Sequence, residues 1–155
     1  MDRPRNDDDL FLCLNELFDE KIPFNKVLGL KVESLSRDGV TTSFEMKDYL
    51  LGHVSRGMLH GGVISSVIDV TGGLSAFMGI EERMMDENIE AKLARFGKVN
   101  TLDLRVDYLR PGRGKRFVAK AHALRTGKKV AVTRIELRNE MDDLIAVGTG
   151  SYIVA

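Results

Sequence analysis

The chain has 155 residues, a size that fits a single domain with one hydrophobic core. Its 23 basic and 23 acidic residues cancel, and aromatic residues make up only 6% with no tryptophan, which argues against a nucleic-acid or anionic-membrane surface. Cys13 is the only cysteine, so an intrachain disulfide is excluded and a reducing compartment is favoured. Residues 1–9 are polar and lack the apolar core of a signal peptide, which predicts a soluble, cytoplasmic protein.

The N-terminal third predicts one helix, two strands and a loop. Apolar residues recur at helical spacing over residues 8–20, which predicts a helix there. Pro23, just after this segment, is expected to stop the helix. Residues 27–35 and 40–46 read as two strands, because an Asp-Gly pair between them is typical of a hairpin. Residues 47–59 have mixed polarity and predict a loop.

The rest of the chain predicts a long helix and four strands. The helix covers residues 61–79, and the charged segment after it, an insertion at about 81–97, suggests a second helix or a lid. The predicted strands cover residues 101–108, 117–125, 130–138 and 144–154. An apolar helix cannot be left in water, so the sheet should curl around it, which makes residues 1–155 one α+β domain.

Asp69 is the single charge in the apolar run from Val63 to Ile80. An acid in such a helix is costly to desolvate and therefore usually has a partner or a task. Placed at helical spacing, it shares its face with small residues only: Gly62, Ser65, Ser66, Gly72, Gly73 and Ala76. Glycine in mid-helix is destabilising, so we expect this face to lie against a second subunit or a narrow substrate channel. The structural alternative is that Asp69 braces a neighbouring loop.

His60-Gly61-Gly62 comes directly before this helix. Two glycines leave bare backbone amides near the positive end of the helix, an arrangement that suits a developing oxyanion. Together with Asp69, the motif predicts an acid or nucleophile facing an electrophilic carbonyl. His60 alone is more typical of a structural hydrogen-bonding residue.

His60-Gly61-Gly62-Val63, then Asp69, then a strand ending Asp107-Tyr108-Leu109-Arg110-Pro111, resembles the hotdog-fold acyl-CoA thioesterases of the PaaI-like branch. The resemblance covers residues 27–154. It implies an antiparallel sheet wrapped around the long helix, and a homodimer or a homotetramer built as a dimer of dimers, with active sites at the dimer interface.

The resemblance also implies roles for individual residues. Asp69 would activate water or attack the thioester carbonyl, and Gly61 would donate its amide to the carbonyl oxygen. His60 would position the loop or bind the thioester. Thr101 would orient the water. Asp69 and the Gly61 loop would come from different subunits, and Gly62 would line the substrate site.

The chain departs from the family pattern at three places. Val54 stands where family members commonly have an asparagine, so water must be positioned differently, with His53 or Ser55 as substitutes. The segment from Asp69 to Thr101 is longer than usual, and the extra length lies in residues 81–96. We expect these residues to form a local lid or a wall of the acyl channel that alters the chain-length preference. Thr101 alternates onto the polar side of its strand, so its role needs that side to face the site.

Coenzyme A carries phosphates, so cations are expected at the pocket mouth. Arg110 lies in one basic turn, and Arg125 and Lys128 lie around another. For any single one of these cations, an ordinary position in a solvated turn is as good an explanation as a phosphate contact. An apolar channel for the acyl group is suggested by four residues: Met58, Leu59, Met84 and Met85.

The sequence therefore predicts hydrolysis of an acyl-CoA thioester to a free acid and CoA. No metal or other cofactor is expected, because no His/Cys cluster has metal-ligand spacing and no phosphate-loop or dinucleotide motif occurs. Two alternatives remain open, a hotdog hydratase or dehydratase acting on acyl thioesters and a non-catalytic acyl-CoA binding protein.

Overall fold

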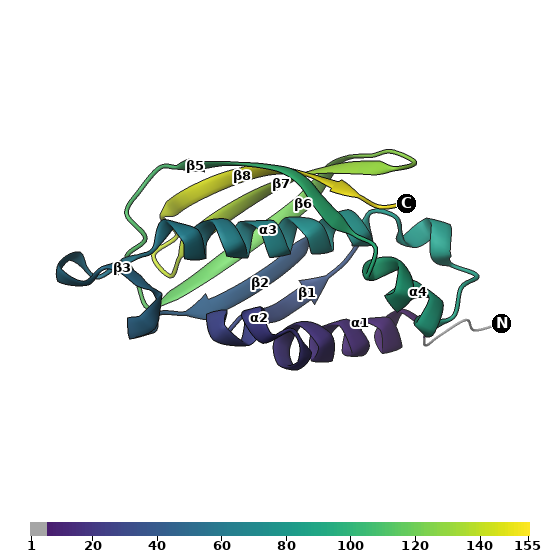
Figure 1. Cartoon of the computed structure of the whole chain (residues 1–155), viewed down its shortest axis with the longest axis horizontal. Coiled ribbons are helices and arrows are strands. Elements are labelled where there is room, and N and C mark those ends of the chain that lie inside the picture. The colour runs from purple at the N-terminus through teal and green to yellow at the C-terminus, as the bar shows by residue number, and fades with distance from the viewer. Residues whose placement is uncertain (1–5) are drawn as a thin grey trace.

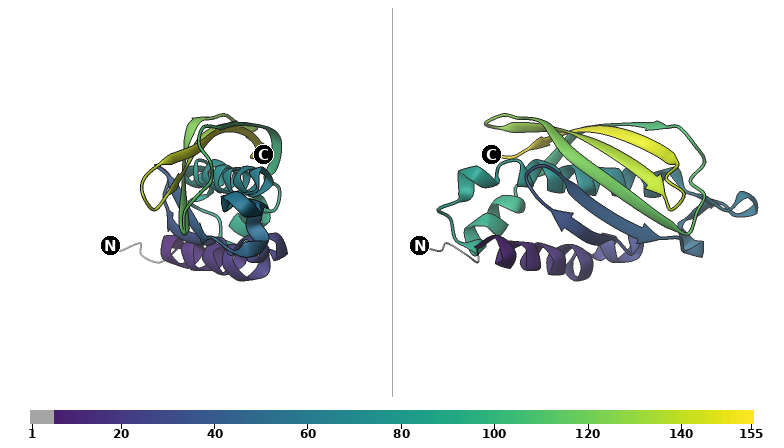
Figure 2. Two further views of the ribbon diagram at one scale, coloured as in Figure 1. Left: turned by 90° about the vertical axis from the view of Figure 1, so that its left-hand side faces the viewer. Right: turned by 180° about the vertical axis from the view of Figure 1, so that it is seen from behind.

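The computed structural model describes residues 6–155, so residues 1–5 of the polar start lie outside the described part. One six-stranded antiparallel sheet curves around the long helix α3 (Gly61–Met78), with the N-terminal helices running along its open side (Figures 1 and 2). The strand order is β1-β2-β6-β7-β8-β5. Its members are β1 (Lys31–Leu35), β2 (Val40–Glu45), β5 (Asn100–Tyr108), β6 (Arg116–Thr126), β7 (Val130–Asn139) and β8 (Leu144–Ile153). The expected α+β hotdog architecture is confirmed.

Helix α3 is the centre of the core. Its first half packs with Phe44 and Phe117 of the sheet, and its second half packs with the N-terminal helix and with Tyr152. By length and composition α3 would be apolar enough to cross a membrane, but 56% of that window is buried inside the protein. It is therefore a core helix wrapped by its own sheet.

Strand β5 forms one edge of the sheet and pairs only with β8. The register between the two strands shifts between Thr101 and Asp103, which marks a β-bulge. Because a bulge shifts the two-residue alternation, Leu102 is 53% exposed although Leu104 and Val106 pack against the core.

The N-terminal segment departs from its predicted course. Helix α1 (Asn6–Glu16) continues into a π-helical turn, η1 (Leu17–Lys21), and Pro23 then opens a further short helix, α2 (Pro23–Leu28), instead of only stopping the first. The predicted strand from residue 27 was therefore wrong in its first part. Proline is well suited to a first helical turn, and Gly29 ends α2 with a left-handed φ of 67°.

The two connections beside α3 contain short elements. The predicted loop before α3 holds η2 (Asp48–Leu50), β3 (Leu51–His53), η3 (Val54–Arg56) and β4 (Met58–Leu59), and it projects beyond the end of the sheet (Figure 1). The charged segment after α3 holds η4 (Glu81–Met84) and α4 (Ile89–Phe96).

The small residues of α3 around Asp69 were predicted to face a second subunit or a substrate channel, but two of them do not. Gly72 and Ala76 are buried in the chain's own core. A Cβ on Gly72 would overlap the Tyr152 hydroxyl and lie 2.9 Å from Ile135 Cδ1. This glycine is therefore explained by the close approach of the sheet.

Candidate active site

Asp69 of α3 and Thr101 of β5 are in direct contact. The Thr101 hydroxyl donates a hydrogen bond of 2.9 Å to Asp69 Oδ1. The bulge in β5 makes this contact, because it turns Thr101 towards α3, whereas simple alternation along the strand would point it away. One carboxylate oxygen is thereby fixed in orientation, and the half-buried carboxylate stays reachable from outside.

Tyr152 of β8 supports Asp69 from behind. Its hydroxyl donates a hydrogen bond of 3.0 Å to the backbone carbonyl of Asp69, and its ring fills the space left by Gly72 and Gly73. Burial raises the pKa of the Tyr152 phenol above its ordinary value, and the nearby Asp69 charge raises it further. Tyr152 is therefore a neutral donor that holds this turn of α3, a role that the sequence analysis missed.

The Asp69–Thr101 pair lies on the wall of a cavity of about 230 Å³. The remaining lining is mostly apolar and comes from the N-terminal helices, α3, α4 and the sheet. These residues are Phe18, Ile22, Phe24, Asn25, Val70, Gly73, Leu74, Phe96, Val99 and Tyr152. A carboxylate beside an apolar cavity can serve a ligand with one reactive polar group and one long apolar group.

The lining of this cavity differs from the set of residues that the sequence suggested for an acyl channel. None of its lining residues is one of the four that the sequence suggested. Leu59 and Met84 are buried in the core, and Met85 is largely exposed. Of the small residues predicted to face a partner or a channel beside Asp69, Gly73 lines the cavity. Of the charged segment after α3, only Phe96 contributes to the lining.

The start of α3 is shaped by His60. Its Nδ1 accepts a hydrogen bond of 2.8 Å from the amide of Gly62, so His60 is the N-cap of the helix. The Gly62 amide is thereby occupied. Within residues 6–155 we find no acceptor for the Gly61 amide, whereas the Gly61 carbonyl accepts a hydrogen bond of 3.0 Å from the Tyr108 hydroxyl. Gly61 is the donor that remains available to a ligand.

Gly61 and Asp69 do not meet within one chain. Both lie on α3, and eight residues at the rise of an α-helix separate them by about 12 Å along its axis. A single carbonyl group cannot contact both residues of the same protomer.

The other predicted site residues are spread over both ends of α3. Val54 lies in the projecting loop before α3 and is 81% exposed. Arg110 follows Tyr108 at the same end and donates a hydrogen bond of 3.1 Å to the Leu144 carbonyl. Exposed Arg125 lies near the end of β6, and exposed Lys128 lies in the β6–β7 turn. Hydrogen bonds from Arg83 to the Gly127 and Thr126 carbonyls fix this turn near the other end of α3.

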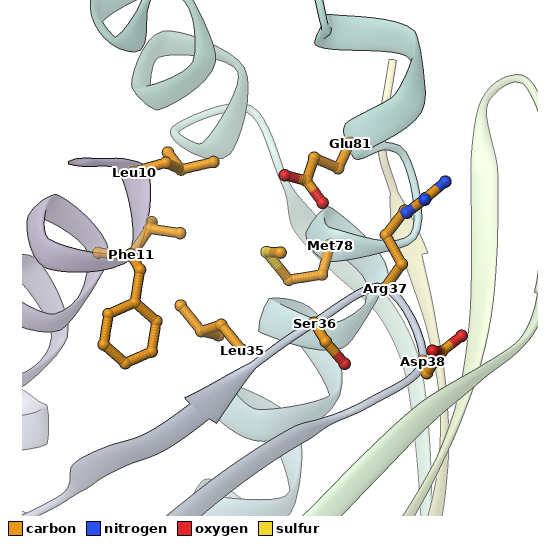
Figure 3. Close-up of a pocket in the computed structure, with 9 residues that line it drawn as sticks. Leu10, Phe11, Leu35, Ser36, Arg37, Asp38, Met78 and Glu81 are labelled. Carbon is orange, nitrogen blue, oxygen red and sulfur yellow. The ribbon is translucent and has the colours of Figure 1, made fainter. Parts of the chain in front are cut away.

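A second cavity, of about 330 Å³, lies between α1, the β1–β2 turn and the end of α3. Leu10, Leu35 and Met78 line it, with Arg37 and Glu81 beside them (Figure 3). It contains neither Asp69 nor Thr101. In the described part of the chain, no group of three or more His, Cys, Asp or Glu side chains is arranged to hold a metal ion.

The comparisons with known proteins agree with this geometry. The model of the thioesterase superfamily matches residues 56–146. The medium/long-chain acyl-CoA thioesterase YigI of Escherichia coli K12 is 40% identical over 144 residues, which cover 91% of both chains.

Solved structures extend the likeness over nearly the whole chain. A candidate thioesterase from Syntrophus aciditrophicus is 54% identical, with a TM-score of 0.89 over 98% of this chain and 100% of the other. A protein from Shewanella oneidensis related to the thioesterase superfamily is 42% identical, with a TM-score of 0.89 over 96% and 97% of the two chains. With sequence and structure agreeing over this length, the chain belongs to the thioesterase superfamily and is a thioester hydrolase.

Proposed function

We propose that the protein hydrolyses medium- or long-chain acyl-CoA thioesters to the free acid and CoA, with Asp69 as the reacting carboxylate. The observation that carries this proposal is the Asp69–Thr101 hydrogen bond on the wall of an apolar cavity. The cavity would take the acyl chain and place the thioester carbonyl beside the carboxylate. The name of the YigI relative supports the same substrate class.

Asp69 would act in one of two ways. As a general base it takes a proton from a water molecule, whose oxygen attacks the carbonyl carbon. The tetrahedral intermediate then collapses, the carbon–sulfur bond breaks, and the CoA thiolate receives the proton. As a nucleophile, Asp69 itself attacks the carbonyl carbon, the carbon–sulfur bond breaks, and the CoA thiolate leaves behind a mixed anhydride. Water then opens the anhydride, which frees the acid and the Asp69 carboxylate, and the proton released goes to the CoA thiolate. The Thr101 hydroxyl donates its hydrogen bond to Asp69, so its lone pairs can accept a hydrogen bond from the water.

The oxyanion would be bound by the Gly61 amide of a second subunit. Because about 12 Å of helix separates Gly61 from Asp69, a complete site needs two copies of the chain. The unpaired edge of β5 is a surface on which a second sheet can pair, with α3 of each subunit near the contact. Val54, which projects beyond the sheet, would approach the partner's site without offering a side-chain hydrogen bond.

Arg110, Arg125 and Lys128 remain candidates for contacts with the CoA phosphates. Since the two basic segments lie near opposite ends of α3, we expect only one of them to supply most of the contacts with the CoA phosphates. Replacement of each cation by glutamine should raise the KM for acyl-CoA only at the turn that is used, and added salt should reduce that difference. We also propose that the protein is cytoplasmic.

The test of the chemistry is CoA release from a panel of acyl-CoA substrates. Asp69→Asn should lower kcat by about 100-fold or more. The control is Asp103→Asn, which changes an exposed acid on β5 and should stay within about twofold of the wild type. Unchanged turnover in Asp69→Asn would remove Asp69 from the reaction. Loss of enoyl absorbance without CoA release would indicate a hydratase, and tight binding without turnover would indicate a binding protein.

A single turnover in ¹⁸O-water separates the two roles of Asp69. A nucleophilic Asp69 whose anhydride is opened by water at the aspartyl carbon receives the heavy oxygen in its own carboxylate, and the released acid carries away an oxygen of Asp69. A general base leaves Asp69 unlabelled, and all the label enters the released acid. Mass spectrometry of the peptide that contains Asp69 distinguishes the two results.

The two-subunit site can be tested with Gly61→Pro. Gly61 is the first residue of α3, where proline fits without breaking a helix, so this change removes the amide donor alone. Gly61→Ala is the control, because its Cβ would meet only Tyr108 at 3.5 Å. Mixed dimers of Gly61→Pro and Asp69→Asn contain one intact site, so re-annealed mixtures should recover roughly a quarter of wild-type activity. No recovery in proven mixed dimers would contradict a shared site.

A further inference from the structure

The lining of the cavity beside Asp69 has an open end and a deep end. Asp69 is half-buried, and Thr101 and Phe24 are exposed, so these residues mark the mouth. Phe18 is only 2% exposed and Leu74 is fully buried, so they mark the deep end. An acyl chain whose thioester lies at Asp69 would extend towards Phe18.

Buried Phe18 meets the half-buried ring of Phe96 at the deep end. Phe18 comes from the π-helical turn η1, and Phe96 is the last residue of α4. Their ring centroids are 5.2 Å apart and their planes are inclined at 56°. Behind Phe96, the fully buried Phe77 packs edge-on with a centroid distance of 5.3 Å. Phe96 is therefore held on two sides, and the pair cannot swing aside without disturbing the core.

We propose that Phe18 and Phe96 form a rigid stop at the deep end of the acyl cavity and set the longest acyl chain that the enzyme accepts. This inference rests on the proposed acyl-CoA hydrolysis and adds the residues that select among its substrates. Shorter chains fit between Asp69 and the rings. A longer chain has to leave methylene groups in water or displace an aromatic ring.

The experiment measures kcat/KM for saturated acyl-CoA substrates from butyryl to stearoyl. Phe18→Leu and Phe96→Leu enlarge the deep end while keeping an apolar side chain, so the preferred chain should become longer. Each methylene that the new space buries should raise kcat/KM about fourfold for the long substrates. The ratio of long-chain to short-chain kcat/KM should therefore rise, because short chains do not reach the two rings.

Two further variants make the test specific. Val99→Phe adds a ring inside the same cavity from a half-buried position and should shift the preference to shorter chains. Phe44→Leu is the matched control, because Phe44 belongs to a different buried aromatic pair, with Phe117 at 5.1 Å, and does not line the cavity. Its profile should keep the wild-type shape. Melting temperatures show that each variant is folded.

Failure of this inference can be told apart from failure of the proposed function. If the wild type releases CoA but folded Phe18→Leu and Phe96→Leu keep its chain-length profile, the stop is overturned and the hydrolysis stands. If no acyl-CoA is hydrolysed, free saturated fatty acids of graded length serve as the probe in thermal-shift measurements. The stop then predicts that Phe18→Leu is stabilised by longer fatty acids than the wild type, and an unchanged length dependence overturns it.

Discussion

The hydroxyl of Thr101 and the carboxylate of Asp69 join an edge strand to the central helix through one hydrogen bond of 2.9 Å. The contact depends on a bulge that reverses the alternation of β5 at this point. Thr101 therefore reaches Asp69 both because it carries a hydroxyl and because the backbone bulge turns that hydroxyl towards α3.

Thr101→Val should lower kcat at least about tenfold with little change in KM, because valine keeps the branched shape and removes the hydroxyl that orients Asp69 and the water. Thr101→Ser should retain most of the activity, since it restores the donor. Steady-state kinetics on one acyl-CoA substrate test both variants. Equal rates for the valine and serine variants would mean that the hydroxyl has no role in turnover.

Tyr152 should make the protein less stable in alkali. Its pKa is raised in the folded state, chiefly by burial, so the unfolded chain loses this proton first as the pH rises through the ordinary value of about 10. The free energy of unfolding contributed by this group is present below that pH and is lost above it. Tyr152→Phe should therefore show a shallower alkaline decline in denaturant titrations, whereas Tyr49→Phe, which changes a largely exposed phenol, should follow the wild type.

Gly72→Ala and Tyr152→Phe should be strongly coupled. A Cβ at position 72 would overlap the Tyr152 hydroxyl, so Gly72→Ala should destabilise the fold by about 1–3 kcal/mol despite the better helix propensity of alanine. In the Tyr152→Phe background the same substitution should cost less, because the hydroxyl is gone. A double-mutant cycle from chemical denaturation measures the coupling. Additive effects would contradict the close contact of Gly72 with this ring.

His60→Ala should cost about 1 kcal/mol of stability, because it removes the side chain that caps α3 through the Gly62 amide. His60→Asn should recover the loss, since asparagine is a strong N-cap residue. If capping is the main role of His60, activity should follow stability in both variants. An asparagine variant that is stable but inactive would instead place the imidazole in contact with the substrate.

The sequence was sufficient for the parts of the fold that repeat a pattern. The helix over residues 61–79 was predicted to within one residue, because a long apolar run with a cap before it has few other solutions. The strands from Arg116 onwards were also predicted closely. In contrast, the short helix at Pro23 was missed, because Pro23 was taken only as a stop signal and Gly29 was not recognised as a helix end.

The site was harder to predict because it depends on contacts between distant segments. Alternation placed Thr101 on the polar side, and the bulge that turns it inward has no clear sequence signal. Gly72 was correctly noted as unusual, but its partner proved to be Tyr152 of the same chain. Residues 81–96 were expected to form a lid or a wall of the acyl channel, and Phe96 of this segment does line the cavity. Phe18 was missed, because it looks like an ordinary core residue until the N-terminal helix is packed beside α4.

The position of the cavity wall along the chain has a consequence for how such enzymes can change. Asp69 and Thr101 lie inside the segment that matches the superfamily, residues 56–146, whereas Phe18, Ile22 and Phe24 precede it. The proposed reactive groups and part of the proposed acyl wall thus lie in separate stretches of sequence. Exchanging the first thirty or so residues between two relatives of similar fold should transfer chain preference and leave the chemistry in place, so the N-terminal segment is the natural unit for redesign.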